Sequence, residues 1–264
     1  MLKITNLSAA HWGSPKGAPV IREIDLSLEG EKALIVGPNG SGKSTLFKAI
    51  LGLADVRSGE VRFNGGEGTA GPPFLGVSTN LESVYHLINL EVEEVTRLHA
   101  EIKGKPPGPA FDWFHRFELD EVLRKPMRNL STGQRKLVGD ILAISFDPKL
   151  ALLDDPFDDV DQRRRVEILR ILRDLPADIL MCTHELDLVR ALPGWTLYFM
   201  LEGRLWGKFP AEELDQLYLT KGEVPNAVAV LRTSFGVFSV TRGSGGVALS
   251  RASSFNTLLE SSLT

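Results

Sequence analysis

The sequence predicts an α/β fold in which a mainly parallel sheet is covered by helices. Along the second half of the chain, short apolar runs alternate with stretches of helical periodicity, which is typical of strands joined by crossover helices. The 264 residues are 43% hydrophobic and 24% charged, as in ordinary globular proteins. At roughly 150 residues per domain this length predicts one to two domains, and it is long enough to bury a core without disulfide staples.

Charge, cysteine content and hydropathy exclude several classes of protein. Cys182 is the single cysteine, which excludes an intramolecular disulfide and fits a reducing compartment. The formal net charge of −4 lacks the basic footprint of a nucleic-acid-binding protein, so we expect no nucleic acid partner. No apolar run approaches the roughly 18 residues of a membrane span. Because residues 1–6 also lack the apolar stretch of a signal peptide, we expect a protein on the cytoplasmic side.

The N-terminal part is predicted to be an antiparallel β subdomain followed by a strand buried on both faces. Ile24, Leu26 and Leu28 alternate with polar residues, which is the period of a half-buried antiparallel strand. The continuous apolar run at 33–36 suits a fully buried strand. The predicted strands are residues 2–7, 20–28, 33–36, 60–64 and 73–78, and a helix is predicted over 44–52.

Residues 81–128 are predicted to be a small helical insertion. Apolar residues recur at helical spacing from Val92 to Ile102, and a Gly/Pro-rich break at 103–109 precedes a second helix over 111–123. An aromatic cluster in that helix either anchors a partner or forms the insertion's own core, and the second interpretation is favoured for most of it. The cluster consists of Phe111, Trp113, Phe114 and Phe117.

The remaining elements divide the chain into a core of residues 1–220 and a small β-rich extension of residues 221–264. Predicted strands of the core lie at 149–154, 178–183 and 196–201, and predicted helices at 131–146, 161–175 and 185–192. The extension is predicted to hold strands at 227–232, 237–241 and 247–249, with Ser253 or Ser254 capping a last short helix. It is either a stabilising flap over the core or a regulatory element.

The strongest motif matches G-x-x-x-x-G-K-[ST] between a predicted strand and a predicted helix. Its glycines let successive backbone N–H groups point at phosphate oxygens, and the new helix adds its positive N-terminal end. Lys43 is expected to reach the outer phosphates, and Ser44 to offer its hydroxyl oxygen to Mg²⁺. The predicted nucleotide-binding residues here are Gly37, Pro38, Asn39, Gly40, Ser41, Gly42, Lys43, Ser44 and Thr45.

An acidic pair supplies the carboxylate that phosphoryl transfer to water requires for holding the metal ion. Asp154 and Asp155 directly follow four apolar residues of a predicted buried strand. Beside a phosphate loop, such a carboxylate is expected to orient the metal ion and its waters. We therefore predict Asp154 as a metal ligand, and Asp155 as the residue that polarises the attacking water.

Further motifs identify a resemblance to the ATP-binding cassette (ABC) ATPases over roughly residues 2–220. The segment Leu130 to Gln134, with Ser131, Thr132 and Gly133, resembles the family's signature LSGGQ. His184 follows a strand where the family has its switch histidine, and Asp161 resembles the aspartate of the D-loop. The resemblance implies a P-loop NTPase fold, ATP and Mg²⁺ as ligands, and catalytic roles for Asp155, His184 and Lys43.

The resemblance also implies that ATP is bound between two cassettes, with the phosphate loop of one facing the signature motif of the other. This chain carries one copy of each motif, so it is expected to act as a homodimer or with a related ABC subunit. Such cassettes are energy-coupling subunits that work with separate membrane permease subunits, on the inner face of the membrane. The open alternatives are a soluble ABC ATPase outside transport, for example in cluster assembly, and a slow-turnover nucleotide-dependent regulator.

Three positions depart from the family pattern, and one aromatic residue completes the predicted site. Asp155 stands where the family most often has glutamate, which predicts slow hydrolysis because a small misplacement at a reacting centre costs on the order of 10²-fold. Asn80 aligns with the family's glutamine and is predicted to contact both nucleotide and metal. Thr132 replaces a glycine of the signature and adds a β-branched side chain. Of His11 and Trp12, we prefer Trp12 as the residue that stacks on adenine.

Overall fold

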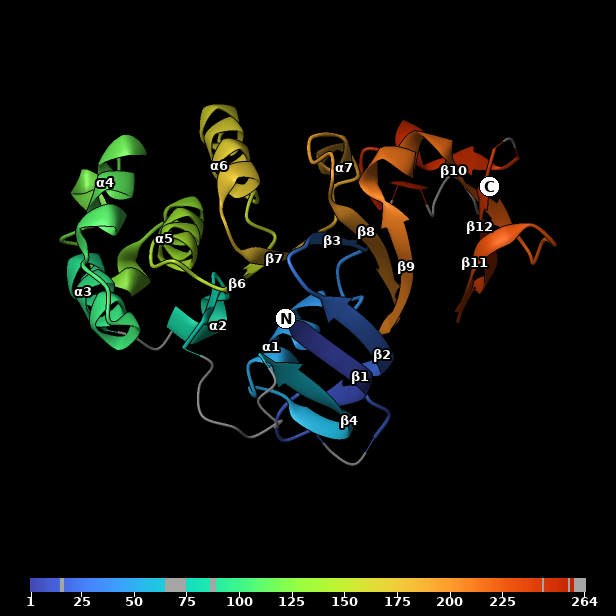
Figure 1. Ribbon diagram of the computed structural model, residues 1–264, viewed down its shortest axis with the longest axis horizontal. Helices are drawn as coiled ribbons and strands as arrows, with labels where there is room; N and C mark the ends of the chain where they lie inside the picture. Colours follow the sequence, from blue (N-terminus) through green and yellow to red (C-terminus); the bar gives the residue numbers. More distant parts are fainter. Residues whose placement is uncertain (15–16, 65–74, 86–88, 244, 256, 259–264) are drawn as a thin grey trace. The chain divides into compact units, whose positions relative to one another are not determined.

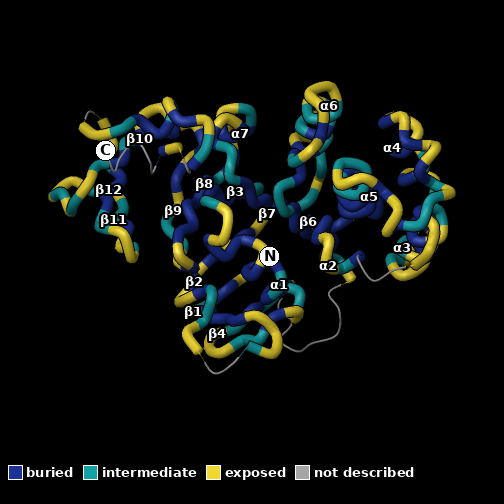
Figure 2. Tube along the Cα trace, turned by 180° about the vertical axis from the view of Figure 1, so that it is seen from behind, coloured by how far each residue is buried: buried dark blue, intermediate teal, exposed yellow. Residues whose placement is uncertain are grey.

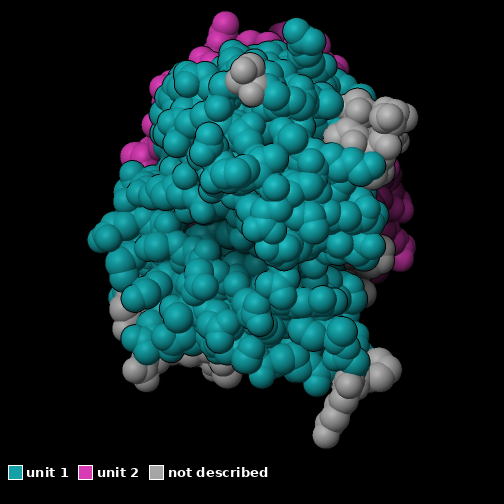
Figure 3. Space-filling view, turned by 90° about the vertical axis from the view of Figure 1, so that its right-hand side faces the viewer, with its two compact units in different colours: residues 1–72, 182–264 teal, residues 73–181 magenta. Residues whose placement is uncertain are grey.

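The computed structural model describes residues 1–14, 17–64, 75–85, 89–243, 245–255 and 257–258 (Figure 1). The chain forms two compact units, which Figure 3 distinguishes by colour. The first unit consists of Met1–Pro72 and Cys182–Thr264, and the second of Pro73–Met181. The phosphate loop and His184 belong to the first unit, whereas Asn80, the acidic pair and the signature belong to the second.

The described residues of the first unit form three groups of strands. Its elements are β1 (Leu2–Ala10), β2 (Ile21–Leu28), β3 (Lys32–Val36), α1 (Lys43–Ile50), β4 (Asp55–Phe63), α7 (Asp187–Arg190), β8 (Thr196–Leu201), β9 (Arg204–Pro210), β10 (Leu217–Lys221), β11 (Ala227–Thr233), β12 (Gly236–Arg242) and β13 (Val247–Ala248). Strands β2, β1 and β4 form an antiparallel sheet in that order, as predicted for the N-terminal subdomain. Strand β3 pairs in parallel with β8, which pairs antiparallel with β9.

The second unit holds strands that are covered by helices. Its elements are β5 (Val77–Thr79), α2 (Glu82–Tyr85), α3 (Val92–Lys103), α4 (Gly108–Arg116), α5 (Thr132–Ile144), β6 (Leu150–Asp154), α6 (Gln162–Asp174) and β7 (Asp178–Thr183), whose last two residues belong to the first unit. Strands β5 and β6 are parallel, and β7 is the next neighbour of β6. The parallel pairs in both units confirm the predicted α/β class.

Burial follows the predicted pattern of the central strands. Every residue of Ala33–Val36 and of Leu150–Leu153 is buried, so these strands are dark in Figure 2. Strands covered on both faces read as continuous apolar runs because both sets of alternating side chains meet a core. In the helical insertion, Phe114 and Phe117 are buried, whereas Phe111 and Trp113 are half-buried. The first pair therefore belongs to the insertion's own core, as favoured from the sequence.

Several predicted boundaries were wrong for identifiable reasons. The second helix of the insertion ends at Arg116 and not at residue 123, because Glu118 adopts a left-handed φ of 56° that stops the helix. The helix predicted over 185–192 is only Asp187–Arg190. Strands β9 and β10 were not predicted, and β9 contains Gly207, a residue type that weakens a strand pattern. Of the strand predicted at 73–78, residues 73–74 lie outside the described residues.

The C-terminal part folds as a four-stranded sheet in the order β11-β12-β10-β13. Strand β12 pairs antiparallel with β11 and with β10, so the strands predicted at 227–232 and 237–241 are present and form a hairpin. The division of the chain into a core of residues 1–220 and an extension of residues 221–264 stays a prediction. Among the described residues, no helix is long and apolar enough to cross a membrane.

Candidate functional site

The phosphate loop connects β3 to α1 in the first unit. Gly42 precedes α1 with a left-handed φ of 108°, a backbone conformation that is strained for residues other than glycine. A Cβ on Gly37 would lie 2.1 Å from the carbonyl oxygen of Met200 in β8, so the loop runs directly against the neighbouring strand. The backbone N–H of Gly203 donates to the carbonyl of Ser41 at 2.8 Å. The glycines therefore serve both the tight turn and its close packing on the β8–β9 hairpin.

Lys43 lies inside the loop. Its side-chain Nζ donates to the carbonyl oxygens of Gly37, at 2.7 Å, and Pro38, at 3.1 Å. The buried Oγ of Ser41 has no hydrogen-bond partner among the described residues, which is uncommon for a buried hydroxyl. The Lys43 ammonium is held by two backbone carbonyls, and the Ser41 hydroxyl can still donate a hydrogen bond. Such a pair of donors suits an anionic ligand with several oxygen atoms.

The switch segment lies next to the phosphate loop in the same unit. The N–H of Gly37 donates to the carbonyl of Thr183 at 3.1 Å, which places the end of β7 against the start of the loop. His184 follows directly and is half-buried. Trp12 lies in the turn after β1 and is 75% exposed, so its ring has a face available for stacking. Thus the residue before His184 is hydrogen-bonded to the start of the loop, and the role of His184 stays a prediction.

In the second unit, Asn80 holds the end of the acidic strand. Its Oδ1 accepts from the N–H of Asp154 at 2.7 Å, and its Nδ2 donates to the carbonyl of Asp154 at 3.2 Å. The same Nδ2 donates to Oδ1 of Asp140 at 2.6 Å. Lys136 adds a further bond to the Asp154 carbonyl, at 2.8 Å. Asn80, which is 2% exposed, therefore fixes the backbone from which the Asp154 carboxylate projects.

Asp140 was missed by the reasoning from sequence. It lies in α5, on the face that packs against the second unit's core, and burial raises the pKa of its carboxyl to about 8. Its Oδ2 has no partner among the described residues. Gly139 beside it leaves space for Asn80, since a Cβ there would lie 3.2 Å from the Asn80 carbonyl oxygen. The available signal was an acidic residue inside the apolar run from Leu137 to Ile144.

Asp155 directly follows Asp154 and adopts a left-handed φ of 42°. Aspartate visits this region more readily than most residues, because its short side chain can bond locally. The carboxylate is half-buried. Its position after the strand end is the one predicted for the residue that polarises water.

The signature residues form the start of α5. Ser131 Oγ accepts from the N–H of Gln134 at 3.2 Å, and Gln134 Oε1 accepts from the N–H of Ser131 at 3.1 Å. This reciprocal arrangement is a capping box, and it fixes the start of the helix, whose N-terminal end is electropositive. Thr132 is the first helical residue and is exposed. The motif thus presents a helix N-terminus that can meet a phosphate.

The D-loop, residues 158–161, packs against the signature. A Cβ on Gly133 would lie 2.5 Å from the carbonyl oxygen of Asp159, so any larger residue at this position would collide with the loop. Asp161 caps α6 by accepting from the N–H of Arg164 at 3.1 Å. Partial burial raises the pKa of Asp161, but hydrogen bonds and charge from Arg164 outweigh it and leave the pKa below its ordinary value.

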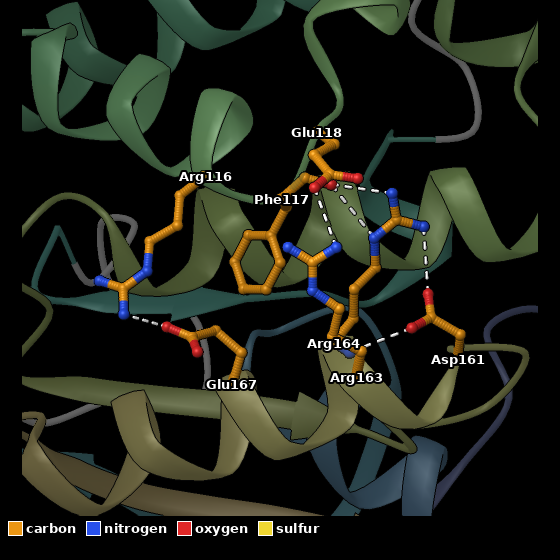
Figure 4. Close-up of a pocket in the computed structure, with 7 residues that line it drawn as sticks. All are labelled: Arg116, Phe117, Glu118, Asp161, Arg163, Arg164 and Glu167. Carbon is orange, nitrogen blue, oxygen red and sulfur yellow. Dashed lines mark hydrogen bonds and ion pairs between the residues drawn. The ribbon is translucent and has the colours of Figure 1, made fainter.

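Arg164 also links the D-loop to the helical insertion (Figure 4). Its Nε and Nη2 donate to the carbonyl oxygen of Phe117, at 3.1 and 2.8 Å, while its Nη1 pairs with Asp161 at 3.1 Å. The ion pairs Arg163–Glu118 and Arg116–Glu167 join α4 and its end to α6 on either side. Together these residues line a pocket of about 310 Å³. The link was not predicted from the sequence.

The fold, the phosphate loop between a buried strand and a helix, and the capped signature helix together define an ATP-binding cassette. A family model described as ABC transporter matches residues 21–158. The chain therefore belongs to the ABC transporter family, and it has the role of the family's ATP-binding subunit, a transport ATPase.

Individual relatives agree with this assignment. A branched-chain amino acid transport ATP-binding protein of Archaeoglobus fulgidus is 31% identical over 81% of this chain and 94% of its own length. A phosphonates import ATP-binding protein of Ruegeria sp. is 30% identical over 68% of this chain and 76% of its own length. Among solved structures, that of a cobalt transport ATP-binding protein covers 98% of this chain and 99% of its own, with a TM-score of 0.88 and 31% identity.

Proposed function

We propose that this chain hydrolyses ATP with Mg²⁺ through the residues predicted from its sequence. The observation that carries the proposal is the phosphate loop, in which Lys43 is held by the carbonyl oxygens of Gly37 and Pro38. Phosphate oxygens are stronger acceptors than carbonyls for an ammonium, so Lys43 would turn to the nucleotide when it binds. Backbone N–H groups from Asn39 to Thr45 and the Ser41 hydroxyl would hold the remaining oxygens.

The residues proposed for the metal are a hydroxyl, a carboxylate and an amide, from Ser44, Asp154 and Asn80. An all-oxygen set of this kind suits Mg²⁺. When bound, the ion would neutralise charge that develops on the transferred phosphoryl group. Asn80 would contribute mainly by holding the backbone of Asp154, while its carbonyl oxygen keeps a second lone pair for the metal or its water.

Asp155 is proposed to accept a hydrogen bond from the attacking water, and His184 to contact the γ-phosphate. Aspartate is one methylene shorter than the glutamate usual in the family, so the water would be held less well and hydrolysis would be slow. The left-handed φ of 42° at Asp155 supports a constrained position for this carboxylate, because the backbone offers few alternatives there.

Two copies of this chain, or this chain and a related subunit, are proposed to bind ATP between them. The capped α5 N-terminus, with Ser131 and Gly133, would face the phosphate loop of the other cassette. Permease subunits would then convert closure and opening into movement of a substrate across the membrane, on whose cytoplasmic face the chain would reside. The names of the relatives support this proposal, since those described above are transport or import ATP-binding proteins.

The test is ATP hydrolysis by the purified chain and its Lys43→Ala variant, with Lys48→Ala as the control. Lys48 lies on the same helix but outside the loop. We expect Lys43→Ala to abolish hydrolysis and ATP-dependent dimerisation, Ser131→Arg to abolish dimerisation, and Lys48→Ala to leave both unchanged. A wild-type chain that does not hydrolyse ATP, or equal activity of Lys43→Ala and wild type, would refute the proposal.

A further inference from the structure

The C-terminal segment, defined as the described residues between 249 and 258, is hydrogen-bonded to residues 184–186, which we call the switch loop. The N–H of Phe255 donates to the carbonyl of His184 at 3.1 Å, and the N–H of Leu186 donates to the carbonyl of Ser253 at 2.9 Å. Between these bonds, Glu185 and Ser254 form an isolated antiparallel bridge. The segment thus adds a short strand-like partner to residues 184–186. This pairing also explains why the helix predicted from residue 185 begins only at Asp187.

Phe255 anchors this pairing in the core of the first unit. Its side chain is 1% exposed, and its ring centroid lies 5.7 Å from that of Phe199 in β8. Phe199 is the register partner of Val36, the residue directly before the phosphate loop. Phe255 therefore bonds to residues 184–186 through its backbone, and its ring packs on Phe199, the sheet neighbour of the residue before the phosphate loop.

The rest of the segment is tied down independently. Arg190 donates to the carbonyl of Ser250 at 2.6 Å and pairs with Asp215 at 3.0 Å. Leu249 and Ala252 are buried on either side of these contacts. The N–H of Thr257 donates to Ser254 Oγ at 3.3 Å, the bond that a capping serine makes. These contacts fix the described residues of the segment within the first unit.

We propose that Phe255 is a positioning residue, which fixes the backbone of His184 and so the direction of its side chain toward the nucleotide. This inference rests on the proposed role of His184 in hydrolysis. Two hydrogen bonds and one buried ring restrict residues 184–186 to one conformation, and a loop that is already ordered loses less entropy when it engages the γ-phosphate. The C-terminal segment is thereby a structural brace of the switch loop, which the sequence left as either a flap or a regulatory element.

The experiment compares Phe255→Ala with Phe255→Leu and Phe238→Ala in the full-length chain. Phe238 is equally buried but lies in β12, where its ring contacts Phe235, so its loss costs the C-terminal sheet a similar volume without touching the switch loop. We expect Phe255→Ala to lower kcat about tenfold with little change in KM for ATP, because misplacement of a catalytic group acts mainly on the chemical step. Phe255→Leu should recover most of kcat, and Phe238→Ala should retain it.

Two further measurements separate this proposal from the general function. If Phe255 acts through His184, then Phe255→Ala should cause no additional loss in a His184→Ala background, whereas independent effects would multiply. Amide hydrogen exchange at Leu186 and Phe255 should be slow in the wild type and fast in Phe255→Ala, a result that needs no ATPase activity.

A wild type without ATPase activity, or a His184→Ala variant with full activity, would defeat the proposed role of His184. Three results would refute the positioning role of Phe255 without affecting the proposed role of His184. They are a wild-type kcat in Phe255→Ala, an equal loss of kcat in Phe238→Ala, and a loss in the His184→Ala and Phe255→Ala double variant equal to the product of the two single losses.

Discussion

Asn80 donates through Nδ2 to the buried carboxyl of Asp140, at 2.6 Å, and through the same amide group it holds the backbone of Asp154. One side chain thus connects the strand end after β5, the signature helix α5 and the acidic strand β6. The Asn80 amide is therefore held firmly by protein groups of the second unit.

Removing the Asp140 side chain should weaken the junction that Asn80 forms between Asp140 and Asp154. In Asp140→Ala the buried Nδ2 of Asn80 keeps the Asp154 carbonyl but loses its shorter hydrogen bond, which costs about 1–3 kcal/mol of unfolding free energy. Asp140→Asn keeps an acceptor oxygen and should cost less. Urea denaturation of both variants, and of Asn80→Ala alone and in combination, measures the coupling between the two residues. Additive effects in the double variant would contradict the junction, since groups in contact couple by roughly 0.5–3 kcal/mol.

Lengthening the carboxylate at position 155 should accelerate hydrolysis. In Asp155→Glu the extra methylene brings the carboxylate closer to the attacking water, and we expect kcat to rise by about tenfold. Part of this gain is offset because glutamate adopts the left-handed φ of 42° less readily than aspartate. Steady-state ATPase assays with Asp155→Asn as the inactive control test the expectation. A turnover number that falls or stays unchanged in Asp155→Glu would show that the aspartate does not limit the rate.

Arg164 should matter far more than its neighbour Arg163. Arg164 bonds both the carbonyl of Phe117 and the carboxylate of Asp161, and its side chain is 30% exposed. Arg163 pairs with Glu118 at a side-chain exposure of 78%. We expect Arg164→Ala to lower the unfolding free energy by about 1–3 kcal/mol, because a part-buried carbonyl loses its donors. Arg163→Ala should cost less than about 1 kcal/mol, as for exposed pairs.

The measurement for this pair is urea denaturation monitored by tryptophan fluorescence, since Trp113 lies on α4 beside the link. Arg164→Lys keeps the charge but loses the two-pronged contact, so it should behave closer to Arg164→Ala than to wild type. Equal stability of the Arg163 and Arg164 variants would contradict the proposed importance of the link.

The helical insertion should lose stability in mild acid through His99. Burial, followed by the charge of Lys103, lowers the pKa of His99 to about 4, against 6.5 for an unperturbed histidine. Between these values the unfolded chain binds a proton that the folded chain does not, so stability falls as the pH falls from about 6.5 to 4. The slope from this residue is at most about 1.4 kcal/mol per pH unit.

His99→Phe keeps an aromatic ring beside Phe146, whose centroid lies 5.6 Å from that of His99, and it cannot take up a proton. Thermal unfolding of this variant should therefore depend less on pH between 6.5 and 4 than that of the wild type. His115→Gln serves as the control, because the His115 side chain is 84% exposed. An unchanged pH dependence in His99→Phe would assign the acid sensitivity to other groups.

Much of this protein followed from residues that are neighbours in the sequence. The phosphate loop from Gly37 to Ser44, the acidic pair at the end of β6 and the signature segment from Leu130 to Gln134 are each contained within a few residues, so local spacing was enough to predict them. The apolar runs of β3 and β6 predicted their burial for the same reason. Edge strands such as β9 were not predicted, because a half-exposed strand with an internal glycine has only a weak alternation of apolar and polar residues.

By itself, the sequence determined the family, the α/β class and the chemical groups offered to a nucleotide, since each depends on short contiguous patterns. Only the tertiary structure decided what supports those groups: Asp140 behind Asn80, 60 residues away in the chain, and Phe255 beside His184. The physical reason is that these contacts join segments distant in sequence, through a buried carboxyl and a backbone pairing that leave no periodic trace. Their existence follows from how strands and helices pack, and local residue spacing carries no information about it.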